Sequence, residues 1–133
     1  MERFEVQTRE HTEFQDITEQ VQELVSRSKI NSGVAHLYIP HTTAGLTINE
    51  NADPDVKADM IKSLEKMVPW KQDHFQHAEG NSAAHIKASM MGFATFVLVE
   101  NGQLVLGMWQ GIYLCEFDGP RKRQVWLRVE GAR

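Results

Sequence analysis

The C-terminal part of the chain, from residue 93 onward, consists of apolar runs of strand length separated by turn residues. Residues 93–100 and 103–106 flank the dipeptide Asn101-Gly102, which favours a two-residue β-hairpin turn. Residues 109–117 and 122–130 have the pattern of two further strands with a short turn between them. This part of the chain is therefore predicted to form a β-sheet.

The preceding part of the chain alternates strands and helices. Three segments have a β-type residue pattern, namely residues 4–8, 34–39 and 44–49. Three others repeat apolar residues at helical spacing, namely residues 17–28, 54–68 and 83–91. Together with the C-terminal strands, they predict an α+β fold of six or seven strands and three helices.

Residues suited to capping support these helix boundaries. Asp16 with Glu19 has the spacing of a capping box for the first helix, and Asp53 before a proline is typical of the start of the second. Asn81 is suited to cap the third helix. That helix carries three small residues that allow close packing against the sheet: Ala83, Ala84 and Ala88.

The chain of 133 residues has the length of one domain, and no repeat or linker divides it, so we treat residues 1–133 as a single unit. Residues 93–99 and 108–117 are apolar on both faces of their predicted strands. Such strands are covered on both sides by helices or by another subunit. With three helices available, this pattern favours a symmetric oligomer; a tightly curled sheet that covers itself is the alternative.

Composition excludes several classes of partner. A net charge of −4 and a pI of about 5.8 do not suit general nucleic-acid binding, which depends on lysine and arginine neutralising phosphates. No apolar run reaches the roughly 18 residues of a membrane span, and the N-terminus lacks the apolar core of a secretory signal. Cys115 has no partner for an internal disulfide. These features lead us to expect a cytoplasmic protein.

Three histidines fall where side chains can bind a ligand. His41 follows a predicted strand end, His77 lies in a polar loop, and His85 lies in the first turn of the third helix. Three neutral imidazoles with an open fourth position form a divalent metal site of the catalytic type. Their spacing matches no standard zinc motif, so solvated loop histidines are the alternative. His11, His36 and His74 are interpreted as surface or sheet residues.

Other polar residues have a structural and a functional interpretation. Glu50 has no capping role and could be a general base or a partner of an imidazole. Arg123 shares a strand face with apolar residues and therefore needs an anionic partner, either an internal carboxylate or a ligand phosphate. Cys115 lies among apolar residues and is interpreted as an inert buried thiol.

Three blocks of the sequence together resemble the YjbQ-like family, namely residues 40–56, 77–85 and 106–123. The resemblance runs from about residue 4 to the end of the chain. It implies an α+β fold with a strongly bent mixed β-sheet, similar to a half-barrel or sandwich, assembled as a homotrimer. It also implies a divalent metal, zinc or alternatively magnesium, bound by His41, His77 and His85. Further characteristic polar positions match Glu50, Asn81 and Arg123.

The resemblance implies a low-level thiamine-phosphate synthase activity, which joins a pyrimidine diphosphate to a thiazole phosphate and releases pyrophosphate. In that hypothesis the metal and Arg123 neutralise the pyrophosphate, the helix start at Asn81 holds a phosphate, and Glu50 transfers a proton. Three imidazoles suit zinc and hydrolysis at least as well as magnesium chemistry. Two alternatives therefore stay open: a metal-dependent hydrolase of a small phosphorylated or carbonyl metabolite, and a non-enzymatic trimeric protein that binds a metabolite or anion.

Overall fold

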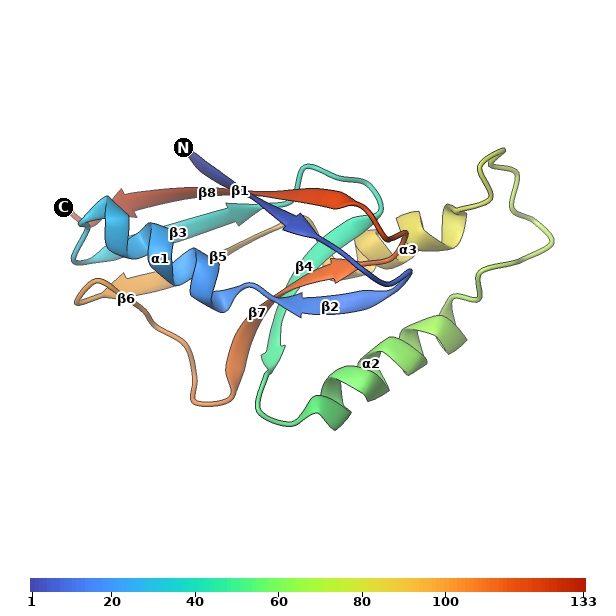
Figure 1. Ribbon diagram of the computed structural model, residues 1–133, viewed down its shortest axis with the longest axis horizontal. Helices are drawn as coiled ribbons and strands as arrows, with labels where there is room; N and C mark the ends of the chain where they lie inside the picture. Colours follow the sequence, from blue (N-terminus) through green and yellow to red (C-terminus); the bar gives the residue numbers. More distant parts are fainter.

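Two antiparallel sheets form the framework of the protein, which the computed structural model describes over residues 1–133. The larger sheet has the strand order β1-β8-β3-β5-β6 and the smaller one β2-β7-β4 (Figure 1). The strands are β1 (Glu2–Gln7), β2 (Glu13–Asp16), β3 (Gly33–Tyr38), β4 (Ala44–Glu50), β5 (Ala94–Glu100), β6 (Gln103–Leu104), β7 (Gln110–Glu116) and β8 (Lys122–Gly131). The helices are α1 (Thr18–Ser28), α2 (Pro54–Met67) and α3 (Ser82–Met91).

The predicted α+β class with three helices and a curled sheet is confirmed, but the expectation of a mixed sheet is wrong. Every strand pair is antiparallel. Parallel neighbours require a crossover connection that returns to the same sheet. Here α1 connects β2 to β3, and α2 and α3 connect β4 to β5, so each helical connection passes from the smaller sheet to the larger one.

The sequence pattern missed one strand and misplaced one cap. β2 contains Phe14 as its only apolar residue, so it has no recognisable alternation. α1 begins after Ile17, and the carboxylate of Asp16 accepts hydrogen bonds from the backbone and hydroxyl of Thr18 without occupying the cap position. The cap of α2 is as predicted, because the Asp53 carboxylate accepts a hydrogen bond of 2.9 Å from the backbone of Asp55.

The smaller sheet lies between two apolar clusters. On one face its residues pack against α1 and the inner face of the larger sheet, through Ile112 and Leu114 of β7. On the other face they pack against α2 and α3, through Tyr113 and Cys115. Alternate residues of β7 are thus buried on opposite sides, since successive side chains of a strand point to opposite faces. The prediction that this strand is covered on both faces is confirmed.

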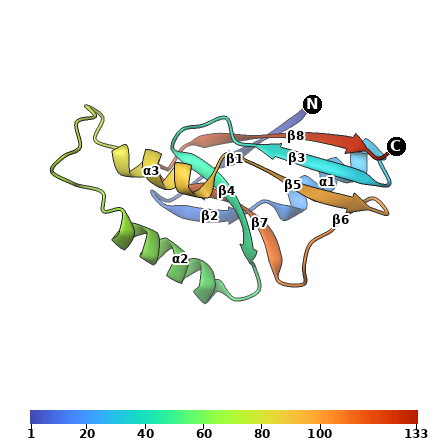
Figure 2. The same ribbon diagram turned by 180° about the vertical axis from the view of Figure 1, so that it is seen from behind.

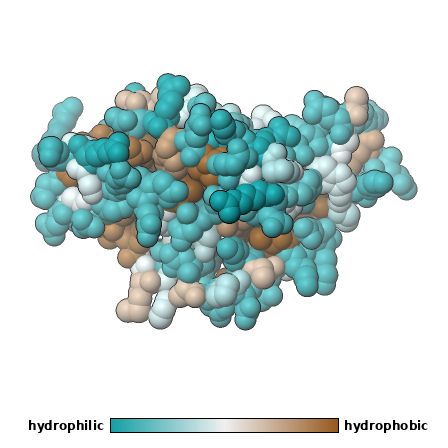
Figure 3. Space-filling model, in the orientation of Figure 1, coloured by the Kyte–Doolittle hydropathy of each residue, from teal (hydrophilic) through white to brown (hydrophobic).

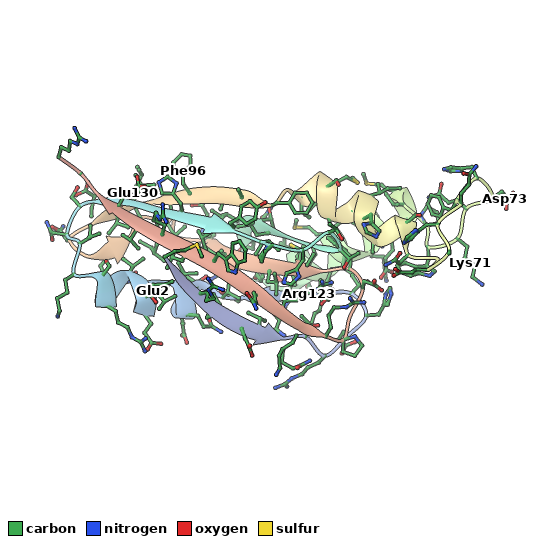
Figure 4. All side chains as sticks on the ribbon, turned by 90° about the horizontal axis from the view of Figure 1, so that it is seen from above. Glu2, Lys71, Asp73, Phe96, Arg123 and Glu130 are labelled. Atoms are coloured by element: carbon green, nitrogen blue, oxygen red, sulfur yellow. The ribbon has the colours of Figure 1, made fainter.

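The outer face of the larger sheet is open in a single chain. Phe96 and Leu98 of β5 are 61% and 51% exposed, and Tyr38 of β3 is 48% exposed. Figure 4 shows Phe96 projecting from this face. The side of the molecule seen in Figure 1 is mainly hydrophilic, with smaller hydrophobic patches (Figure 3). β5 is therefore covered on one face only, by residues of the same chain.

Helix α3 lies very close to β4. A Cβ atom added at Gly45 would be 2.7 Å from the carbonyl oxygen of Gly92 and 3.1 Å from that of Ala88. The buried alanines of α3 complete this close approach, as their small size predicted. The loop between α2 and α3 extends at the end of the molecule opposite the C-terminus (Figure 2). None of the three helices has the length and apolar content needed to cross a membrane.

Candidate functional site

The start of α3 and the loop before it form an open pocket of about 580 Å³. The ring centroids of His77 and His85 are 5.6 Å apart, and the two rings are nearly perpendicular. His85 is held by the helix and His77 by the loop, so two of the three predicted metal ligands lie side by side. The pocket is lined by His74, Phe75, Gln76, His77, Ser82, His85 and Ile86.

His74 is exposed, as its interpretation as a surface residue predicted, and it also lines this open pocket. Its ring contacts the neighbouring Phe75 with centroids 4.9 Å apart. The signal that could have identified it is its position three residues before His77 in the same polar loop. The structure nevertheless contains no group of three His, Cys, Asp or Glu side chains close enough together to hold one metal ion.

Asn81 occupies the cap position of α3, but its side chain does not cap the helix. Its amide nitrogen donates a hydrogen bond of 2.8 Å to Asp118, just beyond the end of β7. Its amide oxygen is buried and accepts no hydrogen bond from the chain. Asn81 therefore connects the start of α3 to the turn between β7 and β8, and its predicted phosphate-binding role stays a prediction.

His41 does not line the pocket. The backbone N–H of Gln124 in β8 donates a hydrogen bond of 2.8 Å to its Nε2 atom. Burial lowers the pKa of His41 below its ordinary value, and the positive charge of Arg123 lowers it further. The neutral imidazole thus carries its proton on Nδ1. Because a metal needs a nitrogen lone pair, the ring as it stands does not fit the three-histidine set, and that set stays a prediction of the resemblance.

Arg123 is buried and paired with an internal carboxylate, which was the structural interpretation of its position. Its Nε atom donates to Glu116 over 2.8 Å and its Nη2 atom donates to the other Glu116 oxygen. The same Nη2 atom also donates to the hydroxyl of Thr43 over 2.8 Å. Figure 4 shows Arg123 near the end of β8 that faces the α2–α3 loop. The hydrogen bonds of the guanidinium within the chain come from Nε and Nη2.

Glu50 is not brought to the histidine pocket. It ends β4, whereas the last turn of α3, with Ala88 and Met91, lies against Gly45 at the start of that strand. Glu50 is not among the residues that line the pocket at the start of α3. The Glu50 carbonyl accepts a hydrogen bond of 3.0 Å from Tyr113. A proton-transfer role for Glu50 at the histidines would need a different arrangement and stays a prediction.

Comparison with known proteins identifies relatives along almost the whole chain. A family model described as "UPF0047 protein YjbQ-like" matches residues 2–132. The UPF0047 protein YugU of Bacillus subtilis is 50% identical over 127 residues, covering 96% of each chain. A UPF0047 protein of Methanocaldococcus jannaschii is 46% identical over 129 residues, covering 97% of this chain and 93% of that protein.

Solved structures agree with this relationship. A YjbQ/UPF0047-family protein of Clostridium acetobutylicum superposes with a TM-score of 0.95 at 48% identity, over 98% of this chain and all of the other. A conserved hypothetical protein of Thermus thermophilus superposes with a TM-score of 0.92 at 42% identity, again over 98% of this chain and all of the other. The chain therefore belongs to the YjbQ-like family, UPF0047.

Proposed function

We propose that the protein binds a divalent metal ion, zinc in preference to magnesium, through His77 and His85 and there takes up a small phosphorylated metabolite. The observation that supports this most directly is the approach of the two rings to 5.6 Å between centroids in an open pocket. Imidazole nitrogens suit zinc, whereas magnesium prefers oxygen ligands. Two ligands leave the remaining coordination positions for water, a substrate oxygen or a further protein ligand.

The surroundings of the pair suit a phosphate. Ser82 lines the pocket and is the first residue of α3, where backbone N–H groups have no partner within the helix. The positive end of the helix dipole favours negative charge at the same point. A bound zinc ion supplies further positive charge for a phosphoryl oxygen. The groups of the chain that would bind the ligand and the metal are then the Ser82 hydroxyl, the backbone N–H groups at the start of α3 and the imidazoles of His77 and His85.

The chemistry proposed for this site is a low-level synthesis of thiamine phosphate from a pyrimidine diphosphate and a thiazole phosphate. The support for it is the family resemblance together with a pocket suited to phosphate. Non-enzymatic capture of a metabolite or anion is the second candidate. The position of Glu50 favours it, because Glu50 lies at the end of β4 and none of the residues that line the pocket has a carboxylate.

We also propose that the protein assembles as a homotrimer through the outer face of the larger sheet. The support is the exposed apolar surface formed by Tyr38, Phe96 and Leu98. Beside it lies an open groove of about 550 Å³, to which Tyr38 and Trp126 contribute stacked rings. An exposed patch of this kind on a sheet is typical of an interface between proteins.

The test is metal content by elemental analysis of untagged protein purified without added metal. We expect stoichiometric zinc in the wild type, loss of zinc in His85→Ala, and unchanged zinc in His36→Ala, whose ring lies on the outer sheet face beside Glu130. No zinc in the wild type would overturn the metal site. The synthase assay then follows thiamine phosphate and pyrophosphate together. Zinc and phosphate binding without turnover would favour the binding protein over the enzyme.

A further inference from the structure

The pocket at the start of α3 is lined by a third imidazole besides those of His77 and His85. This ring belongs to His74, which is exposed and contacts Phe75 with ring centroids 4.9 Å apart. Three imidazoles therefore line one open space of about 580 Å³. Zinc sites of the catalytic type have three protein ligands and one open position. The three rings are not close enough together to hold one ion as they stand, so the third ring has to move.

The other residues that line the pocket are poor ligands for zinc. Phe75 and Ile86 have apolar side chains, and Gln76 and Ser82 offer neutral oxygens. Zinc in proteins is bound mainly by thiolate, imidazole and carboxylate groups, and none of the lining residues has a thiol or a carboxylate. His74 is therefore the one lining residue, besides the pair, whose side chain zinc prefers.

The loop between α2 and α3, residues 69–80, is anchored near its two ends. At one end, Trp70 packs against the apolar cluster beneath α2 and α3, and its ring is edge-on to that of His11 with centroids 4.5 Å apart. At the other end, the buried Asn81 donates a hydrogen bond of 2.8 Å to Asp118. All the residues between these anchors are exposed or half-buried, so no tight packing resists a movement of the loop.

The backbone hydrogen bonds of the loop form two separate turns. The Phe75 N–H donates to the Gln72 carbonyl over 3.1 Å, and the Gly80 N–H donates to the His77 carbonyl over 3.1 Å. His74 lies inside the first turn and His77 begins the second, with a single residue between the turns. Each of these hydrogen bonds joins two residues of one turn, so the first turn can rotate relative to the second without breaking either bond.

The short separation along the chain keeps His74 within reach of the pair. Three residues of extended chain span at most about 11 Å, which limits the distance between the Cα atoms of His74 and His77. The two intervening residues also fall within the range of about two to five that separates paired ligands in zinc sites. Because the loop is short, bringing the two rings together costs little chain entropy.

We propose that His74 is the third protein ligand of the metal ion held by His77 and His85, and that the loop of residues 69–80 closes over the pocket when the ion binds. The proposal rests on the proposed function, since it requires the metal ion at the histidine pair. The bound ion then joins both turns of the loop to α3, and the loop covers the ligand in the pocket.

The first test is the zinc affinity of the untagged protein, measured by competition with a coloured chelator. His74→Ala should bind zinc at least about tenfold more weakly than the wild type, because even the loss of an indirect partner of a metal ligand costs that much. Asp73→Ala is the matched control and should keep the affinity, since Asp73 is exposed on the same loop and does not line the pocket (Figure 4).

The outcomes of this test separate the two proposals. Equal zinc affinities of the wild type and His74→Ala would overturn the role of His74 and leave the pair of His77 and His85 as the metal site. A wild type that binds no zinc would overturn both the metal site and the role of His74.

A thiol at the same position gives a direct signature of coordination. In His74→Cys, the new thiolate should bind Co²⁺ added in place of zinc and give a sulfur-to-metal charge-transfer absorption. The wild type should lack this absorption, because its one thiol, Cys115, is buried. Bound Co²⁺ without the absorption in His74→Cys would show that residue 74 does not reach the ion.

Closure of the loop is tested by limited proteolysis with trypsin. Lys71 is exposed on the loop, at the end of the molecule away from the sheets, so trypsin cleaves after it while the loop is open (Figure 4). Zinc should slow this cleavage severalfold in the wild type and leave it unchanged in His74→Ala. Cleavage at the same rate with and without zinc, in a wild type that binds the ion, would overturn the closure.

Discussion

Arg123 donates a hydrogen bond of 2.8 Å from Nε to Oε1 of Glu116, an oxygen that also accepts one of 2.7 Å from Thr8. The two charged side chains are 2% and 0% exposed. The other Glu116 oxygen accepts from the backbone N–H of Asp118 over 3.0 Å. This buried pair joins the start of β8, the end of β7 and the residue after β1, beneath the loop that carries His41.

Glu116→Gln should destabilise the fold strongly, because it leaves the Arg123 charge buried and unpaired. We expect the free energy of unfolding in urea to fall by about 3 kcal/mol. Glu5→Gln is the matched control, since its exposed pair with Lys122 is 3.8 Å long and should contribute less than about 1 kcal/mol. Equal decreases in the free energy of unfolding of the two variants would contradict the conclusion that Glu116 compensates the buried charge of Arg123.

The lowered pKa of His41 predicts a dependence of stability on pH. Burial, and then Arg123, lower this pKa from 6.5, so the unfolded chain binds a proton on this ring at pH values where the folded chain does not. The free energy of unfolding should therefore decrease as pH falls through 6.5 toward the lower folded pKa, and this contribution should be constant above that range.

Comparing wild type with His41→Asn by urea unfolding from about pH 8 to about pH 5 isolates this effect. The variant should lose part of the pH slope. If the free energy of unfolding depended on pH in the same way in the two proteins, the pKa of His41 would be the same in the folded and unfolded chains.

Phe96→Glu tests the proposed assembly surface. Phe96 is 61% exposed on the outer sheet face, so a charge there costs little within one chain but would be buried in an interface. We expect sedimentation velocity to show the trimer dissociating to smaller species. Met67→Glu is the control, because Met67 is 64% exposed at the end of α2, away from that face. A wild type that sediments as a monomer would refute the trimer.

Cys115 should be unreactive in the folded protein. Its side chain is 0% exposed, and burial raises the pKa of the thiol well above its ordinary value. Since the thiolate is the reactive form, a disulfide reagent at mildly alkaline pH should modify it only as the chain unfolds. The measurement is the absorbance of the coloured thiol that the disulfide reagent releases, recorded with and without urea. Rapid reaction without urea would show that the thiol is accessible.

Gly45→Val should separate α3 from β4. The added atoms would overlap the carbonyl oxygens of Gly92 and Ala88, and overpacking of this kind costs about 1–3 kcal/mol. Thermal unfolding should show a lower melting temperature than in the wild type. Gly107→Ala is the control, because the nearest atoms there belong to the flexible side chain of Gln110 at 3.2 Å. A Gly45→Val protein as stable as this control would contradict the close contact.

Local signals in the sequence determined most helices and strands. The Asp53 cap and the following proline predicted the start of α2, and the Asn101-Gly102 dipeptide predicted the β5–β6 turn, where both residues adopt positive φ angles. The approach of His77 and His85 was also expected, because a short loop and the first helical turn connect them. These features depend on residues that are close together in the chain.

Tertiary structure decided what depends on distant residues. The division into two antiparallel sheets, the position of β2, and the separation of Glu50 from the histidines follow from how strands far apart in sequence pair and pack. The same is true of the two contacts that hold the side chains of His41 and Arg123: the backbone N–H of Gln124 and the carboxylate of Glu116. Sequence spacing carries no signal for them, because a hydrogen bond between residues 83 apart forms only after the whole sheet has fixed both partners.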